Sequence, residues 1–425
     1  MAYDLKTSHI GVVGLGYVGM PLALMLARHM KVTGFDVFER RVKELKSGQD
    51  SNREIKDADL KATSCKFTSY PGDLEACNVY IVTVPTPLDD SNNPDLNAVE
   101  SASRTVASHL KKGDIVVYES TVYPGVTEDV CGPILEEGSN LKCGVDFFLG
   151  YSPERINPGD AEHTVQKITK VVAGQTPEVA DFLADLYGTI NNNNTFKARD
   201  IRTAEAAKAI ENAQRDINVA FINEITMVLS KLGLSTYDVL QAAGTKWNFL
   251  PFTPGLVGGH CIGVDPYYLA HCATNIGHHP EIILAGRKIN DRMGLFVADQ
   301  IAAKIEGKGR VLLLGFTFKE NINDIRNTKV VDIIKRLQEL GHSIDIHDPH
   351  ARPEDVEHEY GMKLVGDLPV KGDYDGIALA VAHNEYKILK PGALEALLKQ
   401  CGFIYDLKGA WRDHKFSAGT DYQTL

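Results

Sequence analysis

Residues 9–19 of this 425-residue chain read His9-Ile10-Gly11-Val12-Val13-Gly14-Leu15-Gly16-Tyr17-Val18-Gly19. The apolar run Ile10–Val13 predicts a buried strand, and the G-x-G-x-x-G pattern after it, with Pro21 just beyond, predicts a tight turn into a helix. In such a turn the glycines let backbone N–H groups approach a pyrophosphate at the helix N-terminus. Because glycine-rich strand ends also form plain turns, the hexapeptide alone is a weak signal.

An acidic residue strengthens this signal. Asp36 ends the next β-type run, about 20 residues after the loop, where a carboxylate would accept a hydrogen bond from a ribose 2′-hydroxyl and repel a 2′-phosphate. The alternative is an acid that merely lies in a loop. We expect Gly14–Gly19 and Asp36 to bind NAD in preference to NADP, although the nearby Arg40 and Arg41 would favour a phosphate.

Short Val- and Ile-rich runs alternate with helical patterns on both sides of one long helical pattern. The runs begin at residues 9, 31, 79, 114, 147, 310, 342, 374 and 402. Such alternation is typical of parallel sheets covered by helices. Thr203–Leu232 forms the uninterrupted helical pattern, with Thr203 as the expected N-cap and Gly233 as the expected C′ residue. We therefore expect an α/β protein with two Rossmann-like, doubly wound parallel-sheet domains, 1–200 and 301–425, joined by a central helical region, 201–300.

The composition is that of a globular protein, with 44% hydrophobic and 24% charged residues. A net charge of −11 argues against a nucleic-acid or membrane-surface partner, because both need a basic face. Seven widely spaced cysteines without a C-x-x-C pair suggest neither a disulfide framework nor a metal site. Glycines and a proline interrupt the first apolar stretch, and no basic segment precedes it, so we expect a cytoplasmic protein.

Hydroxyl-bearing segments follow two of the expected strands. They are Thr83-Val84-Pro85-Thr86-Pro87 and Glu119-Ser120-Thr121. The carboxyl ends of strands bind ligands in open α/β sheets, so Thr86 and Thr121 are candidates to face a nicotinamide. Caps of the following helices are an equally good explanation.

Three polar residues recur on one side of the long helix. Lys208 and Asn212 are four residues apart, and Arg215 follows about one turn later. A lysine and an amide on one face can stabilise a developing oxyanion. A solvated charged face is the more common explanation of this spacing.

One cysteine lies in an unusual setting. Cys261 falls in the glycine-rich loop Leu256–Pro266, four residues before Asp265. A thiolate adds to an aldehyde to give a thiohemiacetal, which can lose a second hydride and leave a thioester for water to cleave. Most cysteines are inert buried side chains, and only the loop and the carboxylate distinguish Cys261 from the other six.

The C-terminal unit supplies two cations after its first expected strand. Lys319 and Arg326 lie in the segment 316–327, at the edge where a parallel sheet binds ligands. They could pair with a diphosphate, or the segment could be a surface loop of mixed charge. No second G-x-G-x-x-G is present, so this unit need not hold a dinucleotide.

Taken together, these motifs resemble the UDP-glucose/GDP-mannose dehydrogenase family, in order from about residue 9 to 410. They are G-L-G-Y-V-G, V-P-T-P, E-S-T-V-Y-P-G, Y-S-P-E-R-I, the K-x-x-x-N helix, G-G-H-C-I-G-V-D-P and G-F-T-F-K-E-N-x-x-D-I-R. The resemblance implies NAD as cofactor, a homodimer built on the central helix, and a UDP-sugar bound by the C-terminal domain.

The resemblance also assigns residues. Cofactor contacts fall on Gly14, Gly16, Tyr17, Val18, Gly19, Asp36, Arg41, Thr86, Thr121 and Arg326. Substrate contacts fall on Glu154, Arg155, Lys208, Asn212, Arg215, Lys319 and the loop from Phe249 to Gly258. Cys261 matches the nucleophile and Asp265 the loop carboxylate used in proton transfer or water positioning. Glu154 would orient the hydrolytic water, and Lys208, Asn212 and Thr121 complete the expected catalytic set.

The nucleophile loop departs from the UDP-glucose branch. That branch has G-G-x-C-x-P-K-D, whereas residues 258–265 read G-G-H-C-I-G-V-D, without the lysine before the aspartate. Together with residues 211–216 and 246–252, this is similar to bacterial UDP-N-acetylglucosamine or UDP-N-acetylgalactosamine 6-dehydrogenases of surface-polysaccharide synthesis, such as capsule or O-antigen. We therefore expect four-electron oxidation of a UDP-N-acetylhexosamine.

Other functions remain compatible with the sequence. A UDP-glucose 6-dehydrogenase or a two-electron hydroxyacid-type dehydrogenase would keep the glycine loop and the K-x-x-x-N helix. An epimerase is suggested by the Y-x-x-x-K match Tyr386–Lys390, which runs straight into Pro391 and Gly392. A non-catalytic NAD-sensing protein would keep the fold alone.

Overall fold

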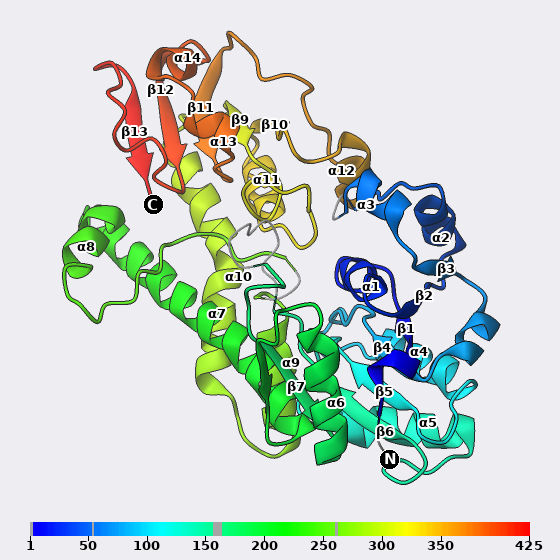
Figure 1. The fold of residues 1–425 in the computed structure, drawn as a ribbon. Helices are drawn as coiled ribbons and strands as arrows, with labels where there is room; N and C mark the ends of the chain where they lie inside the picture. Colours follow the sequence, from blue (N-terminus) through cyan, green and yellow to red (C-terminus); the bar gives the residue numbers. More distant parts are fainter. Residues whose placement is uncertain (1–2, 53–54, 156–163, 260–261) are drawn as a thin grey trace. The chain divides into compact units, whose positions relative to one another are not determined.

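The structure is a computed structural model that describes residues 3–52, 55–155, 164–259 and 262–425. It divides into two compact units. Unit 1 comprises Met1–Glu211 and Tyr267–His278, and unit 2 comprises Asn212–Pro266 and His279–Leu425. Each unit is built on its own largely parallel sheet, which confirms the α/β class and the two Rossmann-like sheets (Figure 1).

The sheet of unit 1 has the strand order β3-β2-β1-β4-β5-β6-β7-β8. Its described strands are β1 His9–Val13, β2 Lys31–Phe35, β3 Lys66–Thr68, β4 Val79–Val82, β5 Ile115–Tyr118, β6 Phe148–Tyr151, β7 Lys170–Gly174 and β8 Thr195–Lys197. All neighbours pair in parallel except β6 and β7, which are antiparallel. The sequence predicted neither this antiparallel pair nor β3, β7 and β8.

Helices precede or connect these strands. They are η1 Leu5–Thr7, α1 Gly19–Ala27, α2 Glu39–Lys46, α3 Asp57–Ala62, η2 Pro71–Ala76, α4 Asn97–Ala107, the π-helical turn η3 Val126–Cys131, α5 Gly132–Ser139 and α6 Pro177–Gly188. Successive side chains of a strand point to opposite faces, so a sheet buried on both faces needs continuous apolar strands. In β4, Val79 and Ile81 accordingly pack in one core, and Tyr80 and Val82 in another.

The strand order places a ligand crevice in unit 1. The chain builds β1, β2 and β3 outward in one direction and then returns to add β4 on the other side of β1. Helices that follow β1 and β4 leave the sheet in opposite directions at this reversal, and open α/β sheets bind ligands there, outside the carboxyl ends of the strands. Gly14 follows β1 and Thr83 follows β4, so both lie at this edge.

The sheet of unit 2 has the order β10-β9-β11-β12-β13, and its described pairs are all parallel. Its strands are β9 Arg310–Leu314, β10 Ser343–His347, β11 Tyr374–Leu379, β12 Leu398–Asp406 and β13 Asp421–Thr424. Its helices are α8 Thr236–Ala243, α10 Glu281–Ala302, α11 Val330–Glu339, α12 Pro353–Tyr360, α13 Asn384–Lys387 and α14 Pro391–Glu395. The order reverses between β9 and β11, which gives this sheet a ligand edge of its own.

Two helices contain residues of both units, α7 Ile201–Leu232 and α9 Asp265–Asn275. The long helix is confirmed and is drawn in green in Figure 1. Its expected N-cap, Thr203, is wrong, because α7 begins at Ile201 and the Asp200 side chain accepts the N–H of Thr203 at 2.8 Å. Gly233 has φ +68° and is the predicted C′ residue. No helix within the described ranges is long and apolar enough to cross a membrane.

Candidate active site

The glycine turn of unit 1 is shaped by close backbone contacts. Gly14 has φ +98°, a conformation that residues with a Cβ rarely adopt. A Cβ on Gly19 would lie 1.9 Å from the carbonyl oxygen of Gly14 and 2.3 Å from Oγ1 of Thr83, whereas a Cβ on Gly16 would meet no atom within 4 Å. Gly19 therefore permits the close packing of α1 on the sheet, and the open side of Gly16 is where a pyrophosphate can approach the backbone.

The acidic residue of the cofactor site is held by the same turn. Asp36 is almost completely buried, and its carboxylate accepts the N–H of Leu15 at 2.8 Å and that of Phe38 at 2.9 Å. Each oxygen retains a further lone pair, so a ribose hydroxyl can still be accepted. These residues therefore fit NAD, in which the ribose beside Asp36 carries a 2′-hydroxyl and not a 2′-phosphate.

The two arginines after Asp36 differ in their surroundings. Arg41 donates from Nε to the carbonyl of Leu15 at 2.9 Å and pairs with the buried Asp50 at 2.8 Å, while Arg40 is exposed. Nη2 of Arg41 is buried without a hydrogen-bond partner among the described atoms. Because Asp50 already neutralises Arg41, this arginine attracts a 2′-phosphate less than an unpaired arginine would.

The hydroxyl residues that follow β4 and β5 in the sequence lie at the ligand edge of the sheet. Thr86 and Thr121 are both half-buried. Thr121 follows Glu119 and Ser120, which are buried, and the hydroxyl of Ser120 donates to the carbonyl of Val84 at 2.6 Å. The segment after β5 is thus fastened to the segment after β4, which carries Thr86.

Glu154 and Arg155 follow β6 at the same edge. Glu154 accepts the N–H of Arg155 at 2.6 Å and lies 3.5 Å from Nζ of Lys170. The guanidinium of Arg155 pairs with Glu211 at 2.7 Å and donates to the carbonyl of Thr169 at 2.9 Å. The sequence predicted Glu154 but not Lys170, because the strand that carries Lys170 was not expected.

The three polar residues predicted on α7 do not share one environment. Lys208 and Asn212 are buried, with exposed fractions of 7% and 6%, whereas Arg215 is exposed. A solvated charged face is therefore wrong for Lys208 and Asn212, since a lysine is rarely buried without a function or a partner. Their burial favours the catalytic alternative, and Arg215 does not belong to the buried set.

In unit 2, Asn212 is joined to the loop carboxylate. Its Nδ2 donates to Oδ2 of Asp265 at 2.5 Å, and Asp265 is 1% exposed at the start of α9. The expected nucleophile, Cys261, lies outside the described residues. Glycines flank it on the N-terminal side, where a Cβ on Gly258 would lie 2.7 Å from the carbonyl oxygen of Asn327. This loop is thus packed against the segment that follows β9.

The ligand edge of unit 2 carries a pocket with a basic lining. It is lined by Leu256, Gly258, Thr317, Phe318, Lys319, Glu320, Thr328, Lys329, Val330, Ala380, Val381 and Lys408. Residues 317–320 follow β9 and residues 380–381 follow β11, so the pocket lies where the strand order reverses. Lys319 was predicted. Lys329 and Lys408 were missed, because neither lies in a motif that points to an anion.

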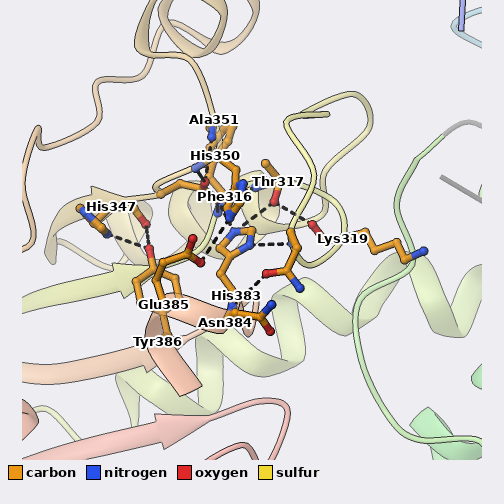
Figure 2. Close-up of polar contacts among 12 residues, drawn as sticks. Phe316, Thr317, Lys319, His347, His350, Ala351, His383, Asn384, Glu385 and Tyr386 are labelled. Carbon is orange, nitrogen blue, oxygen red and sulfur yellow. Dashed lines mark hydrogen bonds and ion pairs between the residues drawn. The ribbon is translucent and has the colours of Figure 1, made fainter. Parts of the chain in front are cut away.

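A buried network fixes the segment that carries Lys319 (Figure 2). Asp348 accepts the N–H of Phe316 at 2.6 Å, that of Thr317 at 3.0 Å, and Nε2 of His383 at 2.9 Å. Nδ1 of His383 accepts the N–H of Asn321 at 2.9 Å. These contacts hold the pKa of Asp348 well below its usual range despite its burial, because its imidazole and N–H partners favour the charged form. In Figure 2 the Lys319 side chain points away from this network.

Two further predicted contacts also lie in unit 2. Arg326 pairs with Asp324 through two hydrogen bonds, of 2.8 and 2.5 Å, and is half-buried. Phe249 is half-buried in the loop after α8 and donates its N–H to the carbonyl of Lys246 at 3.0 Å.

The epimerase alternative is not supported by the geometry of its motif. The Tyr386 hydroxyl is buried and lies 2.8 Å from the carbonyl oxygen and 2.7 Å from Nδ1 of His347. Burial raises its pKa further above that of an ordinary tyrosine, the opposite of what a catalytic base needs. Lys390 is exposed. The Y-x-x-x-K match is therefore a structural tyrosine near a surface lysine.

Comparison with known proteins covers almost the whole chain. The UDP-glucose/GDP-mannose dehydrogenase family matches in three parts: its NAD binding domain at residues 8–191, its central domain at 202–292 and its UDP binding domain at 312–413. A UDP-N-acetyl-D-glucosamine 6-dehydrogenase of Pseudomonas aeruginosa is 54% identical over 411 residues, 95% of this chain and 97% of that protein. One of Salmonella typhi is 48% identical, over 96% and 97% of the two chains.

A solved structure agrees with these sequence relatives. The UDP-D-ManNAc dehydrogenase of Pyrococcus horikoshii superposes with a TM-score of 0.88 at 29% identity, covering 98% of this chain and 99% of that one. The NAD binding domain match spans the glycine turn and Asp36, and the UDP binding domain match spans Lys319 and Lys408. This chain belongs to the UDP-glucose/GDP-mannose dehydrogenase family and is an NAD-dependent nucleotide-sugar dehydrogenase.

Proposed function

We propose that the enzyme oxidises the C6 alcohol of a UDP-N-acetylhexosamine to the carboxylate, with UDP-GlcNAc as the favoured substrate. The observation that carries this proposal is the 54% identity, over 95% of the chain, to a protein named for that reaction. Relatives named NDP-N-acetyl-D-galactosaminuronic acid dehydrogenase are only 29% and 30% identical, which favours the gluco over the galacto configuration.

The proposed reaction removes four electrons from C6. One primary alcohol, two NAD and one water give one carboxylate, two NADH and three protons. NAD, when bound, accepts the hydride that leaves C6 in each of two oxidations. The protein must therefore hold the alcohol, accept protons, keep the aldehyde bound and admit water only at the last step.

The basic pocket of unit 2 supports binding of the diphosphate. Lys319, Lys329 and Lys408 contribute three cations to its lining against one carboxylate, Glu320, in a protein whose net charge is −11, and Lys329 also pairs with Asp291 at 3.1 Å. A local concentration of ammonium groups is what a UDP-sugar requires in an otherwise acidic chain. Lys408 also lies 3.4 Å from Glu320, and this carboxylate helps to orient its side chain.

In the first oxidation the alcohol loses its hydroxyl proton to a base as hydride leaves C6. Asp265 is the carboxylate we assign to proton transfer, with its orientation fixed by Asn212. Lys208 and the second N–H of Asn212 are donors for the oxygen on C6, because an ammonium group and an amide both stabilise developing negative charge.

In the second oxidation the Cys261 thiolate attacks the aldehyde carbon. A C–S bond forms, and the carbonyl electrons move to oxygen to give a thiohemiacetal anion that the same two donors stabilise. Loss of the second hydride leaves a thioester. Water then attacks the thioester carbon, a C–O bond forms and the C–S bond breaks, so that Cys261 is restored. Glu154 is assigned to orient this water.

We also propose that the enzyme is a homodimer. In unit 2, α7 exposes Phe221, Val228 and Leu232, with exposed fractions of 55%, 49% and 65%. Their spacing of seven and four residues places them on one side of the helix. An exposed apolar stripe of this kind is suited to pair with a second copy, and light scattering on the purified protein tests it.

The experiment that tests the substrate compares UDP-sugars at saturating NAD by the absorbance of NADH. We expect kcat/KM for UDP-GlcNAc to exceed that for UDP-glucose by at least about tenfold, since an acetamido site left empty leaves polar groups unpaired at roughly 1 to 3 kcal/mol each. UDP-GalNAc tests the configuration at C4. Equal kcat/KM for UDP-GlcNAc and UDP-glucose would reject the N-acetyl preference and leave a UDP-glucose 6-dehydrogenase.

A further inference from the structure

Unit 1 contains a buried lysine between two carboxylates. Nζ of Lys170 lies 2.6 Å from Oε2 of Glu119 and 3.5 Å from Oε2 of Glu154. The side chains of Lys170 and Glu119 are 5% and 0% exposed, and that of Glu154 is 17% exposed. The other oxygen of Glu119 accepts a hydrogen bond of 2.5 Å from the hydroxyl of Tyr187. A chain of contacts therefore runs from the interior of the unit to Glu154.

The sheet topology explains how these residues meet. Glu119 follows β5 and Glu154 follows β6, and these two strands are parallel. Strand β7 runs antiparallel to β6, so Lys170, its first residue, lies at the edge where β5 and β6 end. A parallel β7 would have placed this lysine at the opposite edge. The antiparallel pair thus brings a cation to the carboxyl ends of the strands, where the predicted catalytic residues Thr121 and Glu154 lie.

A buried ion pair of this kind is weak evidence for a role in stability. Burying an ion pair costs several kcal/mol of desolvation per ion, and an apolar pair of similar volume is often as stable or more so. Burial raises the pKa of Glu119, and the two neighbouring carboxylates raise the pKa of Lys170 although burial opposes this. Lys170 is thus kept charged by its carboxylate partners.

We propose that Lys170 is a positioning residue that holds Glu154 for attack of water on the acyl-enzyme. The inference rests on the proposed function, because it takes Glu154 as the residue that orients this water. One oxygen of Glu154 is directed to Lys170, and the other accepts the N–H of Arg155 at 2.6 Å. Glu119 secures Lys170 in turn, and Glu119 begins the segment that carries Thr121.

The step that depends on Lys170 is hydrolysis. Water attacks the thioester carbon, the new C–O bond replaces the C–S bond, the thiolate leaves on Cys261, and the proton of water passes to a carboxylate. Without the contact to Lys170, the Glu154 side chain can rotate. A smaller fraction of acyl-enzyme molecules then holds a water aligned for attack on the thioester carbon. Both hydride transfers come before this step and do not require Glu154.

Pre-steady-state kinetics with UDP-GlcNAc and NAD separate these steps. We expect Lys170→Met to release a burst approaching two NADH per active site, followed by turnover at least about tenfold slower than wild type, a change of about 1.4 kcal/mol. The sugar adduct should accumulate on the intact protein, as seen by mass spectrometry, and KM should not rise. Lys197→Met, which breaks the exposed pair with Asp181 in the same unit, is the matched control and should behave as wild type.

A double-mutant cycle distinguishes positioning from folding. Glu154→Gln should show the same burst. If Lys170 acts through Glu154, the double variant Lys170→Met/Glu154→Gln should turn over no more slowly than Glu154→Gln alone. Lys170→Met/Glu119→Gln removes both charges of the buried pair, so that Glu119 is not left as an uncompensated buried charge. This variant should still accumulate adduct. Turnover of this variant at the wild-type rate, or independent effects of Lys170→Met and Glu154→Gln, would overturn the proposal. A wild-type enzyme that makes no NADH from UDP-GlcNAc would refute the proposed function instead.

Discussion

Asn212 donates a hydrogen bond of 2.5 Å to Asp265, and both side chains are buried. The two residues lie 53 positions apart in the sequence, one on α7 and one at the start of α9. An amide has two N–H donors, so this contact fixes the plane of the Asn212 amide and leaves a second donor for a substrate oxygen. The orientation of a proposed oxyanion donor is therefore set by the carboxylate proposed to move protons.

Removal of the Asn212 amide should lower turnover more than stability. We expect Asn212→Ala to reduce kcat by about 100-fold or more, as for loss of a single oxyanion donor, with a smaller change in KM for UDP-GlcNAc. Asn218→Ala is the control, because Asn218 lies on the same helix and its side-chain amide donates to the carbonyl of Gln214 within that helix. A kcat for Asn212→Ala within about twofold of the control would remove Asn212 from the catalytic set.

Cofactor preference should depend on Asp36. The Asp36 carboxylate is fixed by the N–H groups of Leu15 and Phe38 and would repel a 2′-phosphate. We expect wild type to favour NAD, and Asp36→Ala to lower the ratio of kcat/KM for NAD over NADP by at least about tenfold, or about 1.4 kcal/mol. Glu39→Gln, at an exposed acid on α2, should leave this ratio unchanged. A wild-type preference for NADP would mean that Arg40 dominates the site.

Lys408 should contribute to UDP binding. A charge-assisted hydrogen bond is worth roughly 1.5 to 3 kcal/mol, so Lys408→Gln should weaken the binding of UDP by about 10- to 100-fold in calorimetry. The KM for NAD should not change. Lys371→Gln, at an exposed lysine of the same unit, is the control. If Lys408→Gln binds UDP as tightly as this control does, the basic pocket is not the diphosphate site.

The stability of the enzyme should carry a pH dependence from Glu205. This carboxylate is buried on α7 and accepts the N–H groups of Gly125 at 2.6 Å and Thr127 at 2.9 Å. Burial raises its pKa from 4.5 to about 7, since desolvation outweighs these hydrogen bonds. The folded state therefore holds this proton more tightly than the unfolded state does.

The direction of the effect follows from linkage. Because the folded-state pKa is the higher one, the contribution of Glu205 is fully present below about pH 4.5 and is lost as pH rises through about 7. At about 1.4 kcal/mol per pKa unit, the loss is roughly 3 kcal/mol. Denaturant unfolding at pH 5 and pH 8 should show wild type losing more stability than Glu205→Gln over this interval. Equal pH dependence in both proteins would show that Glu205 does not titrate there.

Much of the fold could be predicted because it depends on local patterns. Apolar runs such as Ile10–Val13 and Val311–Leu314 lie in strands buried on both faces, and their residues alternate between two cores. Strands β3 and β8 have three residues each and carry charged ends, so no periodicity marks them. Strand β7 begins with a lysine, and the direction in which a strand pairs is a tertiary property that its own sequence does not encode.

Only the site residues that lie in recognisable sequence motifs could be predicted. Asp36, Lys208 and Asn212 were identified from spacing and resemblance, and the structure places all three in buried positions. Lys170 and Lys408 were missed, because each is a lone lysine whose function depends on partners distant in sequence, Glu119 in one case and Glu320 in the other. Arg215, which was predicted together with Lys208 and Asn212, is exposed, so it differs from them in burial, and its contact with substrate stays a prediction.

The measurement that tests the covalent four-electron oxidation most directly is the number of NADH formed per UDP-GlcNAc consumed, in wild type and in Cys261→Ala. A thiolate, which a thiol with an ordinary pKa near 8.5 can supply, makes the tetrahedral centre from which the second hydride leaves. We expect wild type to form two NADH per sugar, with a sugar adduct on residue 261 when turnover is stalled at low pH. Cys261→Ala should bind NAD and UDP-sugar yet lose four-electron turnover by several orders of magnitude. The covalent account is wrong if Cys261→Ala still forms two NADH per sugar at a rate within about tenfold of wild type. Such a loss would correspond to less than roughly 1.4 kcal/mol of activation free energy.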